Sequence, residues 1–244
     1  MSARLLDAID ATWPAAETLA RDGWVFRRGG GGGKRVSAAS LPMREGVDVR
    51  AEDLPDLDMA EYQMRAWKQP PLFRIAPWER GLDRRLAMAG YKVIDPVAIY
   101  SAPLAALKDT SDETARVIRA STDVAIVREI WAQGGIGDAR RAVMDRAAGE
   151  KVTLLARLGD RPVGCAFVAR DGEVAMIHAI EVLPEARRQG IGEMLLRGGA
   201  NWADGLGAQV LALAVVKDNR PACALYEKLG MSVGSAYHYR IRGG

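Results

Sequence analysis

The chain has 244 residues, 49% of them apolar, so it can bury a core and a disordered chain is not expected. Its 34 Lys and Arg against 31 Asp and Glu leave a net charge of +3, too diffuse for a nucleic-acid-binding protein. No apolar run is long enough to span a membrane, no signal-peptide profile is present, and the two cysteines fit neither a zinc site nor a disulfide framework. We therefore expect a protein of the reducing cytoplasm with no metal, membrane or nucleic-acid partner.

The beginning of the chain alternates short helical and strand patterns. Residues 4–21 are predicted to form a helix that Pro14 bends or restarts, and residues 24–26 a strand. Five glycines follow at 29–33, and the lysine after them precedes an arginine, where a phosphate-binding loop needs Ser or Thr. We therefore interpret the glycines as a flexible hairpin tip, with residues 34–39 as the returning strand.

A helix, a glycine and a strand follow one another at residues 82–94, and the same pattern returns at 225–233. A polar crossing at 102–114 separates the two parts. These observations predict a pseudo-repeat with a degenerate first half, 1–107, and a second domain, 113–244.

The second half is predicted to contain a strand, two helices, three antiparallel strands, and then helix, strand, helix and strand. The expected positions are 115–120, 122–131, 138–148, 152–158, 162–170, 174–183, the helix that begins near 191, 209–216, 218–229 and 232–241.

A strand ending at Pro184 leads into a basic turn with two glycines and then a helix. Free N–H groups and the positive end of the helix dipole meet at such a helix start, which favours a phosphate or pyrophosphate ligand. Gly190 and Gly192 allow the backbone to approach that ligand closely. The residues expected to bind it are Arg187, Arg188, Gln189, Gly190, Ile191 and Gly192.

The Arg-x-x-Gly-x-Gly motif at 187–192 resembles the acyl-CoA signature of the GNAT acetyltransferase superfamily. The Asn, Ala, Leu-Tyr and Gly spaced along 219–230 resemble a second segment of that family, although Met231 stands where Phe is usual. The order of elements from about residue 113 to the end is also the GNAT order. The resemblance implies an α/β fold with a mixed, mostly antiparallel sheet flanked by helices, joined to a smaller GNAT-like N-terminal domain.

The resemblance further implies an acetyl-CoA-dependent N-acetyltransferase in which an amine attacks the thioester directly within a ternary complex. In this reading the backbone of Val182 helps to align the acyl group, Asn219 hydrogen-bonds the pantetheine arm and Tyr226 protonates the departing thiolate. A turn asparagine and a packed core tyrosine are the alternatives for the last two residues. Because the first half lacks the glycine motif, we expect one acetyl-CoA per chain.

The amine must lose a proton, so a base or a water relay is needed. His178 titrates near neutral pH and is expected on the strand face of Met176, Ile180 and Val182. Some family members have a histidine at this place. Glu181 is expected on the opposite face, near the end of the strand. The alternatives are a hydrogen-bonded core histidine and a salt-bridged rim glutamate.

The acceptor is expected to be a small-molecule or peptide amine, bound near the loop at 133–138 and the last strands. Arg140 and Arg141 would steer an acidic acceptor, but a solvated helix face explains them equally well. A protein N-terminal amine, as in the ribosomal-protein alanine acetyltransferases, is the nearest alternative acceptor. A non-catalytic acyl-CoA sensor is a different class of function. The oligomeric state stays open, a dimer included.

Overall fold

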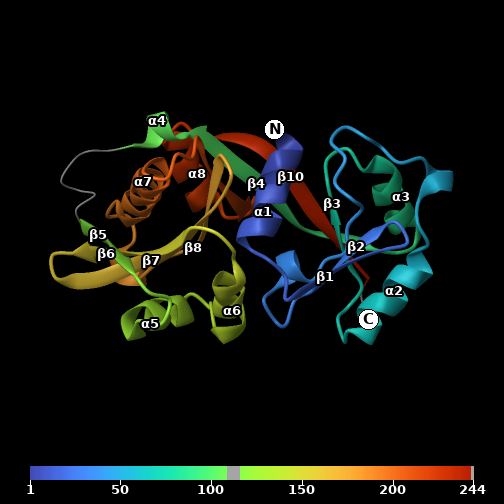
Figure 1. Ribbon diagram of the computed structural model, residues 1–244, viewed down its shortest axis with the longest axis horizontal. Helices are drawn as coiled ribbons and strands as arrows, with labels where there is room; N and C mark the ends of the chain where they lie inside the picture. Colours follow the sequence, from blue (N-terminus) through green and yellow to red (C-terminus); the bar gives the residue numbers. More distant parts are fainter. Residues whose placement is uncertain (109–115, 243–244) are drawn as a thin grey trace.

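The structure, a computed structural model, describes residues 1–108 and 116–242 (Figure 1). Eight strands form one sheet in the order β3-β10-β4-β9-β8-β7-β6-β5, and β1 and β2 form a small second sheet. In the large sheet only β8 and β9 are parallel; every other pair is antiparallel. This confirms the predicted α/β class with a mixed, mostly antiparallel sheet.

The strands are β1 (Glu17–Arg21), β2 (Trp24–Arg28), β3 (Leu72–Ile75), β4 (Lys92–Pro103), β5 (Val117–Ala120), β6 (Lys151–Leu158), β7 (Arg161–Asp171), β8 (Val174–Val182), β9 (Val210–Val216) and β10 (Ser232–Ile241). The α-helices are α1 (Ser2–Thr12), α2 (Leu57–Ala66), α3 (Arg80–Met88), α4 (Leu104–Leu107), α5 (Ala125–Gln133), α6 (Asp138–Arg146), α7 (Ile191–Asp204) and α8 (Arg220–Lys228). The expected strand at 115–120 begins within the described residues at Val117; its residue 115 lies outside them.

Helices cover both faces of the large sheet, as Figure 1 shows. In the central strand β8, Ala175 and Ile177 pack in the core under α7, whereas Val174 and Met176 pack on the other face under α1. Helices α5 and α6 cover that second face farther along β7. Successive side chains of a strand point to opposite faces of the sheet, so alternate residues of β8 pack on opposite faces. Because helices cover both faces, the strand has a nearly continuous apolar sequence.

Two β–α–β units form the half of the large sheet that begins at its edge strand β3. The units are β3-α3-β4 and β9-α8-β10. The second strand of each unit pairs with the first strand of the other, so that β4 pairs with β9 and β10 pairs with β3. Both helices end alike: Gly90 and Gly230 have left-handed backbones, and the N–H after each bonds to a carbonyl five residues back, at 2.9 and 3.0 Å. The repeated sequence pattern at these two places is therefore one local structure used twice.

The beginning of the chain differs from the prediction of a single helix at 4–21. Helix α1 ends at Thr12, and residues 17–21 form β1. Pro14 has no N–H to donate, so it ends the helix here rather than bending it. Because β1 pairs with β2, the hairpin tip is Asp22-Gly23, and residues 34–36 form a 3₁₀ turn instead of the expected returning strand.

The five glycines at 29–33 form a closely packed loop against α6, so their interpretation as a flexible hairpin tip was wrong. A Cβ on Gly32 would lie 2.5 Å from Cγ2 of Val143, and one on Gly31 would lie 3.2 Å from Cβ of Ala139. Three of the five glycines have φ between 56° and 100°. Close packing and a left-handed backbone therefore both disfavour larger residues here.

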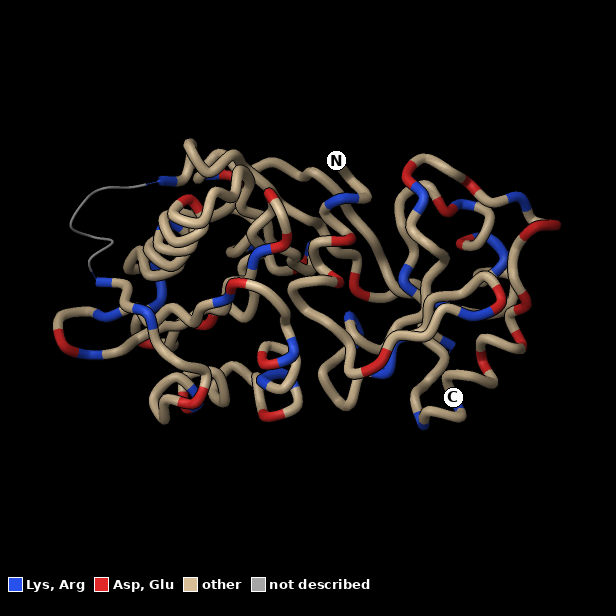
Figure 2. The backbone as a smooth tube through the Cα atoms, in the orientation of Figure 1, with Lys and Arg blue, Asp and Glu red and all other residues tan. Residues whose placement is uncertain are grey.

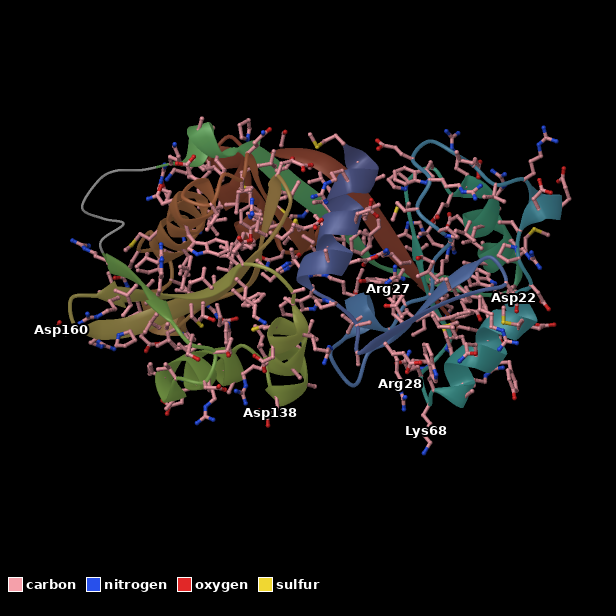
Figure 3. The ribbon with its side chains drawn as sticks, viewed as in Figure 1. Asp22, Arg27, Arg28, Lys68, Asp138 and Asp160 are labelled. Carbon is pink, nitrogen blue, oxygen red and sulfur yellow. The ribbon has the colours of Figure 1, made fainter. Side chains whose placement is uncertain are left out.

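Basic and acidic residues are interspersed over both halves of the molecule in Figure 2. Most project outward, as Lys68 and Asp160 do in Figure 3, but Arg27 lies inside the molecule beside α1. There Arg27 and Arg74 both donate to Asp10, which ties α1 to β2 and β3. Within the described residues, no helix combines the length and the apolar character that crossing a bilayer requires.

Candidate active site

The parallel strands β8 and β9 pair only over their first residues, Val174–Met176 with Val210–Ala212. Beyond these residues the two strands diverge. Strand β8 then leads to α7, and β9 leads to α8. Ligands of α/β folds bind at the carboxyl ends of parallel strands, which makes this divergence the first place to look for a site.

The turn between β8 and α7 has the shape that the sequence predicts. The strand ends at Val182 and the helix begins at Ile191. Its N-cap, Gly190, has φ of 80°, and Arg188 has φ of 63°. Among the described residues no side chain caps the helix, so the N–H groups of its first turn, including that of Gly192, have no intrahelical or capping acceptor there. The turn thus offers backbone donors and the positive end of a helix dipole to an anion.

The side chains of this turn behave differently from one another. Arg187 folds back onto the end of β8, where its Nε donates to the Val182 carbonyl at 3.1 Å and its Nη2 lies 3.4 Å from Oε1 of Glu181. Gln189 donates to a carbonyl within the turn. Arg188 is exposed and is the basic residue of the turn that remains available to a ligand.

Two of the predicted residues belong to helix α8: Asn219 is its N-cap, and Tyr226 lies in its last turn. The side chain of Asn219 caps the helix by accepting from the Ala222 N–H at 3.3 Å. Tyr226 is buried beside α7, with its ring centroid 5.5 Å from that of Tyr100. Burial, assisted by nearby Cys223, raises the pKa of Tyr226 to about 12, so the phenol keeps its proton at neutral pH.

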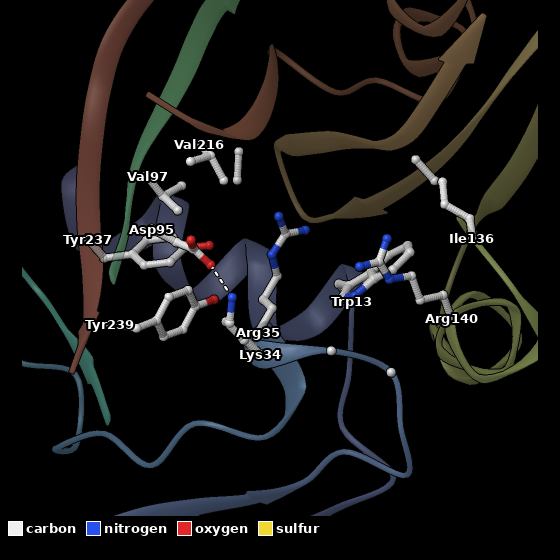
Figure 4. A pocket seen from close by; sticks show the side chains of 14 residues that line it. Trp13, Lys34, Arg35, Asp95, Val97, Ile136, Arg140, Val216, Tyr237 and Tyr239 are labelled. Atoms are coloured by element: carbon white, nitrogen blue, oxygen red, sulfur yellow. Dashed lines mark hydrogen bonds and ion pairs between the residues drawn. The ribbon is translucent and has the colours of Figure 1, made fainter. Parts of the chain in front are cut away.

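A cavity of about 270 Å³ lies where β8 and β9 have separated, and Figure 4 shows its lining. Residues from both halves of the chain enclose it. The lining residues are Trp13, Gly32, Gly33, Lys34, Arg35, Asp95, Val97, Ile136, Arg140, Ala179, Ala214, Val216, Tyr237 and Tyr239.

Residues 121–231, which contain this turn, α8 and the diverging strands, match the family model of the acetyltransferase (GNAT) family. This part of the chain is a GNAT-family domain. The protein is accordingly an acyltransferase, and the resemblance of the second half of the chain to the GNAT family is confirmed.

Proteins similar to this chain match it over nearly its whole length. The chain is similar to an uncharacterized N-acetyltransferase of Bacillus subtilis (strain 168), YobR, with 27% identity over 248 residues and 95% of each chain covered. A GCN5-related N-acetyltransferase from Kribbella flavida has a similar structure, with a TM-score of 0.74 and 16% identity over 100% of this chain and 96% of that one. A tandem GNAT protein from the clavulanic acid biosynthesis pathway aligns with a TM-score of 0.54 and 13% identity, over 83% and 74%. These two structures show a shared fold.

A bulge in β8 decides where the candidate bases of this GNAT site lie. Ala179 has φ of 51°, and the pairing with β7 shifts register there. Before the bulge, Met176 and His178 face α1; after it, Ile180 and Val182 pack against the core under α7. The expectation that His178 shares a face with Ile180 and Val182 was therefore wrong, because an extra residue in a strand reverses the alternation.

His178 is buried, and both of its ring nitrogens have partners. Nδ1 lies 3.4 Å from Nη1 of Arg35, which can only donate, so Nδ1 accepts. Nε2 lies 2.9 Å from Oγ1 of Thr12, whose own proton goes to the Ala8 carbonyl at 2.6 Å, so Nε2 carries the hydrogen. Burial and the charge of Arg35 hold the pKa of His178 well below its usual range. The ring is neutral and presents no free lone pair to the cavity.

Glu181 lies after the bulge, between the turn before α7 and the end of α5. Its carboxylate packs against Gly134, where any Cβ would overlap it. The side chain is 18% exposed, and its ion-pair partner Arg187 is on the surface. The carboxylate of Glu181 is therefore accessible to water, whereas both ring nitrogens of His178 are buried and already have partners.

Of the basic and aromatic residues in the cavity wall, sequence reasoning named only Arg140 as a candidate for the acceptor site and missed the others. Arg35 was placed on a hairpin strand, and Asp95 and Tyr237 belong to no motif. Lys34 and Asp95 form an ion pair at 2.5 Å across 61 residues of sequence. The only sequence signal was the run of five glycines, which marks a close approach of backbone to α6.

Proposed function

We propose that this GNAT chain transfers an acetyl group from acetyl-CoA to a primary amine. The observation that carries the proposal is the uncapped start of α7 at the mouth of the diverging strands, where the pyrophosphate of the coenzyme binds the 187–192 turn. Arg188 adds a cation to this site. The exposed end of α8, with Asn219, faces the pantetheine arm.

In the proposed reaction the amine nitrogen attacks the thioester carbonyl carbon within a ternary complex. A C–N bond forms, and the C–S bond breaks as the tetrahedral intermediate collapses, while the backbone of Val182 helps to align the acyl group. The proton lost by the nitrogen passes through water to the Glu181 carboxylate, which we place ahead of His178 because the histidine has no free lone pair. Tyr226 gives its proton to the departing thiolate.

We also propose that the chain is a tandem arrangement of a degenerate half, 1–107, and a catalytic half, 113–244. The exchanged β–α–β units support this division. The first half supplies β4 and one wall of the cavity, and we propose that it holds no coenzyme. Because both cysteines are free thiols, we place the reaction in the reducing cytoplasm.

Two substitutions at Gly190 test the coenzyme site. Asn and Asp both tolerate a left-handed backbone and have nearly the same size, and no atom lies within 4 Å of a Cβ built at this position. Gly190→Asp places a negative charge beside the pyrophosphate, which should weaken acetyl-CoA binding by at least ~2 kcal/mol relative to Gly190→Asn. Calorimetric titration measures this difference, with about one acetyl-CoA bound per wild-type chain. Equal affinities for the two variants would place the pyrophosphate elsewhere.

The activity itself is tested by thiol release from acetyl-CoA in the presence of amino acids, polyamines, aminoglycosides and peptides. We expect release that depends on the added amine, with mass spectrometry showing an N-acetylated product. Release only with peptides that have a free N-terminus would favour a protein acceptor. Tight acetyl-CoA binding without release for any amine would contradict the proposal and indicate a sensor.

A further inference from the structure

The cavity wall carries a cation that no carboxylate neutralises. Of its basic residues, Lys34 is paired with Asp95, and Arg140 is exposed at the rim. Arg35 is partly buried, yet within residues 1–108 and 116–242 no carboxylate lies within ion-pair distance of its guanidinium. A cation that is partly withdrawn from water and unpaired in the protein is suited to bind an anionic ligand.

Arg35 is held in a fixed position. One Nη donates to Nδ1 of His178, which donates to Thr12, which donates to the Ala8 carbonyl of α1. The guanidinium carbon lies 5.9 Å from the centroid of the Trp13 ring, within the range of a cation–π contact. The hydrogen bonds therefore run in one direction, from Arg35 to the Ala8 carbonyl, and hold the guanidinium at the wall of the cavity shown in Figure 4.

A second group in the same wall lacks a partner. The hydroxyl of Tyr237, on β10, is buried and makes no hydrogen bond within the described residues. It lies near the Arg35 guanidinium and the Tyr239 hydroxyl and interacts with both, but neither contact has the full geometry of a hydrogen bond. A buried hydroxyl without a partner is unfavourable unless a ligand supplies the acceptor.

We infer that the acceptor is an amino acid, and that Arg35 and Tyr237 bind its carboxylate while its amine receives the acetyl group. This inference rests on the proposed function and deepens it. One guanidinium and one hydroxyl suit the two oxygens of a carboxylate, whereas a phosphate would require more donors. The volume of about 270 Å³ is near the lower end of the ~300–1,000 Å³ range of ligand pockets, so the acceptor is small.

Matched pairs of acceptors test this inference. Each pair is an L-amino acid and the amine that remains when its carboxyl group is removed: alanine with ethylamine, and phenylalanine with phenethylamine. At one pH and one acetyl-CoA concentration, we expect kcat/KM to be about 10- to 100-fold higher for the amino acid, as for one charge-assisted hydrogen bond. Equal values for both members of every pair would overturn the inference.

Three variants locate the effect. Arg35→Gln should remove the preference for the amino acid and raise its KM, with little change for the matched amine. Tyr237→Phe removes a hydroxyl that makes no well-formed hydrogen bond within the described residues, so the variant should fold normally and still lower the preference several-fold. Arg44→Gln, at an exposed arginine of the same half, is the control and should keep the wild-type preference. A preference that survives both Arg35→Gln and Tyr237→Phe would overturn the assignment.

Direct binding separates this inference from the proposed function. Calorimetry of alanine and phenylalanine with the CoA-loaded protein reports carboxylate binding without any acetyl transfer. Binding that Arg35→Gln removes, together with no thiol release for any amine, would leave the carboxylate site standing and contradict only the transferase proposal. Thiol release with simple amines and no binding of either amino acid would do the opposite.

Discussion

Replacing Tyr226 by Phe is expected to reduce turnover by roughly 10²–10⁴-fold, the usual contribution of a positioned general acid. The thiolate that leaves acetyl-CoA is a poor leaving group until it is protonated. Tyr226 lies on α8 beside the start of α7, and no described residue accepts a hydrogen bond from its hydroxyl. Its pKa of about 12 means that the donor is protonated at every pH at which the protein is expected to work.

The substitution should leave the fold and coenzyme affinity almost unchanged. The ring packs against Tyr100 and the core under α7, and phenylalanine keeps those contacts. Single-turnover measurement of thiol release isolates the chemical step from product release. Tyr62→Phe, at a side chain 73% exposed on α2, is the matched control and should keep the wild-type rate. A Tyr226→Phe variant with wild-type single-turnover rates would make this tyrosine a packing residue.

The second half of the chain was largely predictable because its signals are local. The strand that ends near Val182, the glycine turn and the helix from Ile191 lie within a few residues of one another, and the structure has them in place. Predicted helix starts were less accurate. The helix expected at 122–131 begins instead at Ala125, and Thr122, which was expected to be its N-cap, bonds to Asp145. Several polar residues near a helix start can each accept an N–H, so spacing alone does not select one.

The cavity wall was not predictable because it depends on contacts between residues far apart in the sequence. Strand β4 lies between β9 and β10, and the glycine loop before Arg35 packs against α6; neither contact leaves a periodic pattern. The face of His178 was mispredicted for a similar reason. A single left-handed residue, Ala179, reverses the alternation of β8, and alanine is not a residue that marks such a bulge.

Replacing Asp10 by Asn is expected to lower the free energy of unfolding by about 3 kcal/mol, the lower end of the effect of breaking a buried ion pair, because Asp10 is partly exposed. Its carboxylate accepts from Arg27 at 2.6 Å and from two nitrogens of Arg74 at 2.7 and 2.8 Å. These guanidiniums are 8% and 2% exposed, so removing the shared carboxylate charge leaves two buried cations uncompensated.

The same network gives the stability a defined pH dependence. Burial alone would raise the pKa of Asp10, but the charges and hydrogen bonds of Arg74 and Arg27 outweigh it and lower the pKa to about 2. A carboxyl group whose folded pKa is depressed stabilises the fold above its unfolded pKa, near 4. This contribution is lost as the pH falls toward 2. Urea unfolding should therefore show the wild-type advantage over Asp10→Asn at pH 7 shrinking in this acidic window.

Asp7→Asn is the matched control, because Asp7 lies one turn earlier on α1. Burial and the charge of Asp10 raise the pKa of Asp7, so its ionised form does not stabilise the fold. Removing that charge should change the free energy of unfolding by less than about 0.5 kcal/mol, or stabilise the protein slightly at pH 7. If both variants unfolded at the same urea concentration with equal slopes, the three-residue network would not hold α1 against β2 and β3. A lower midpoint for Asp10→Asn alone would show that it does.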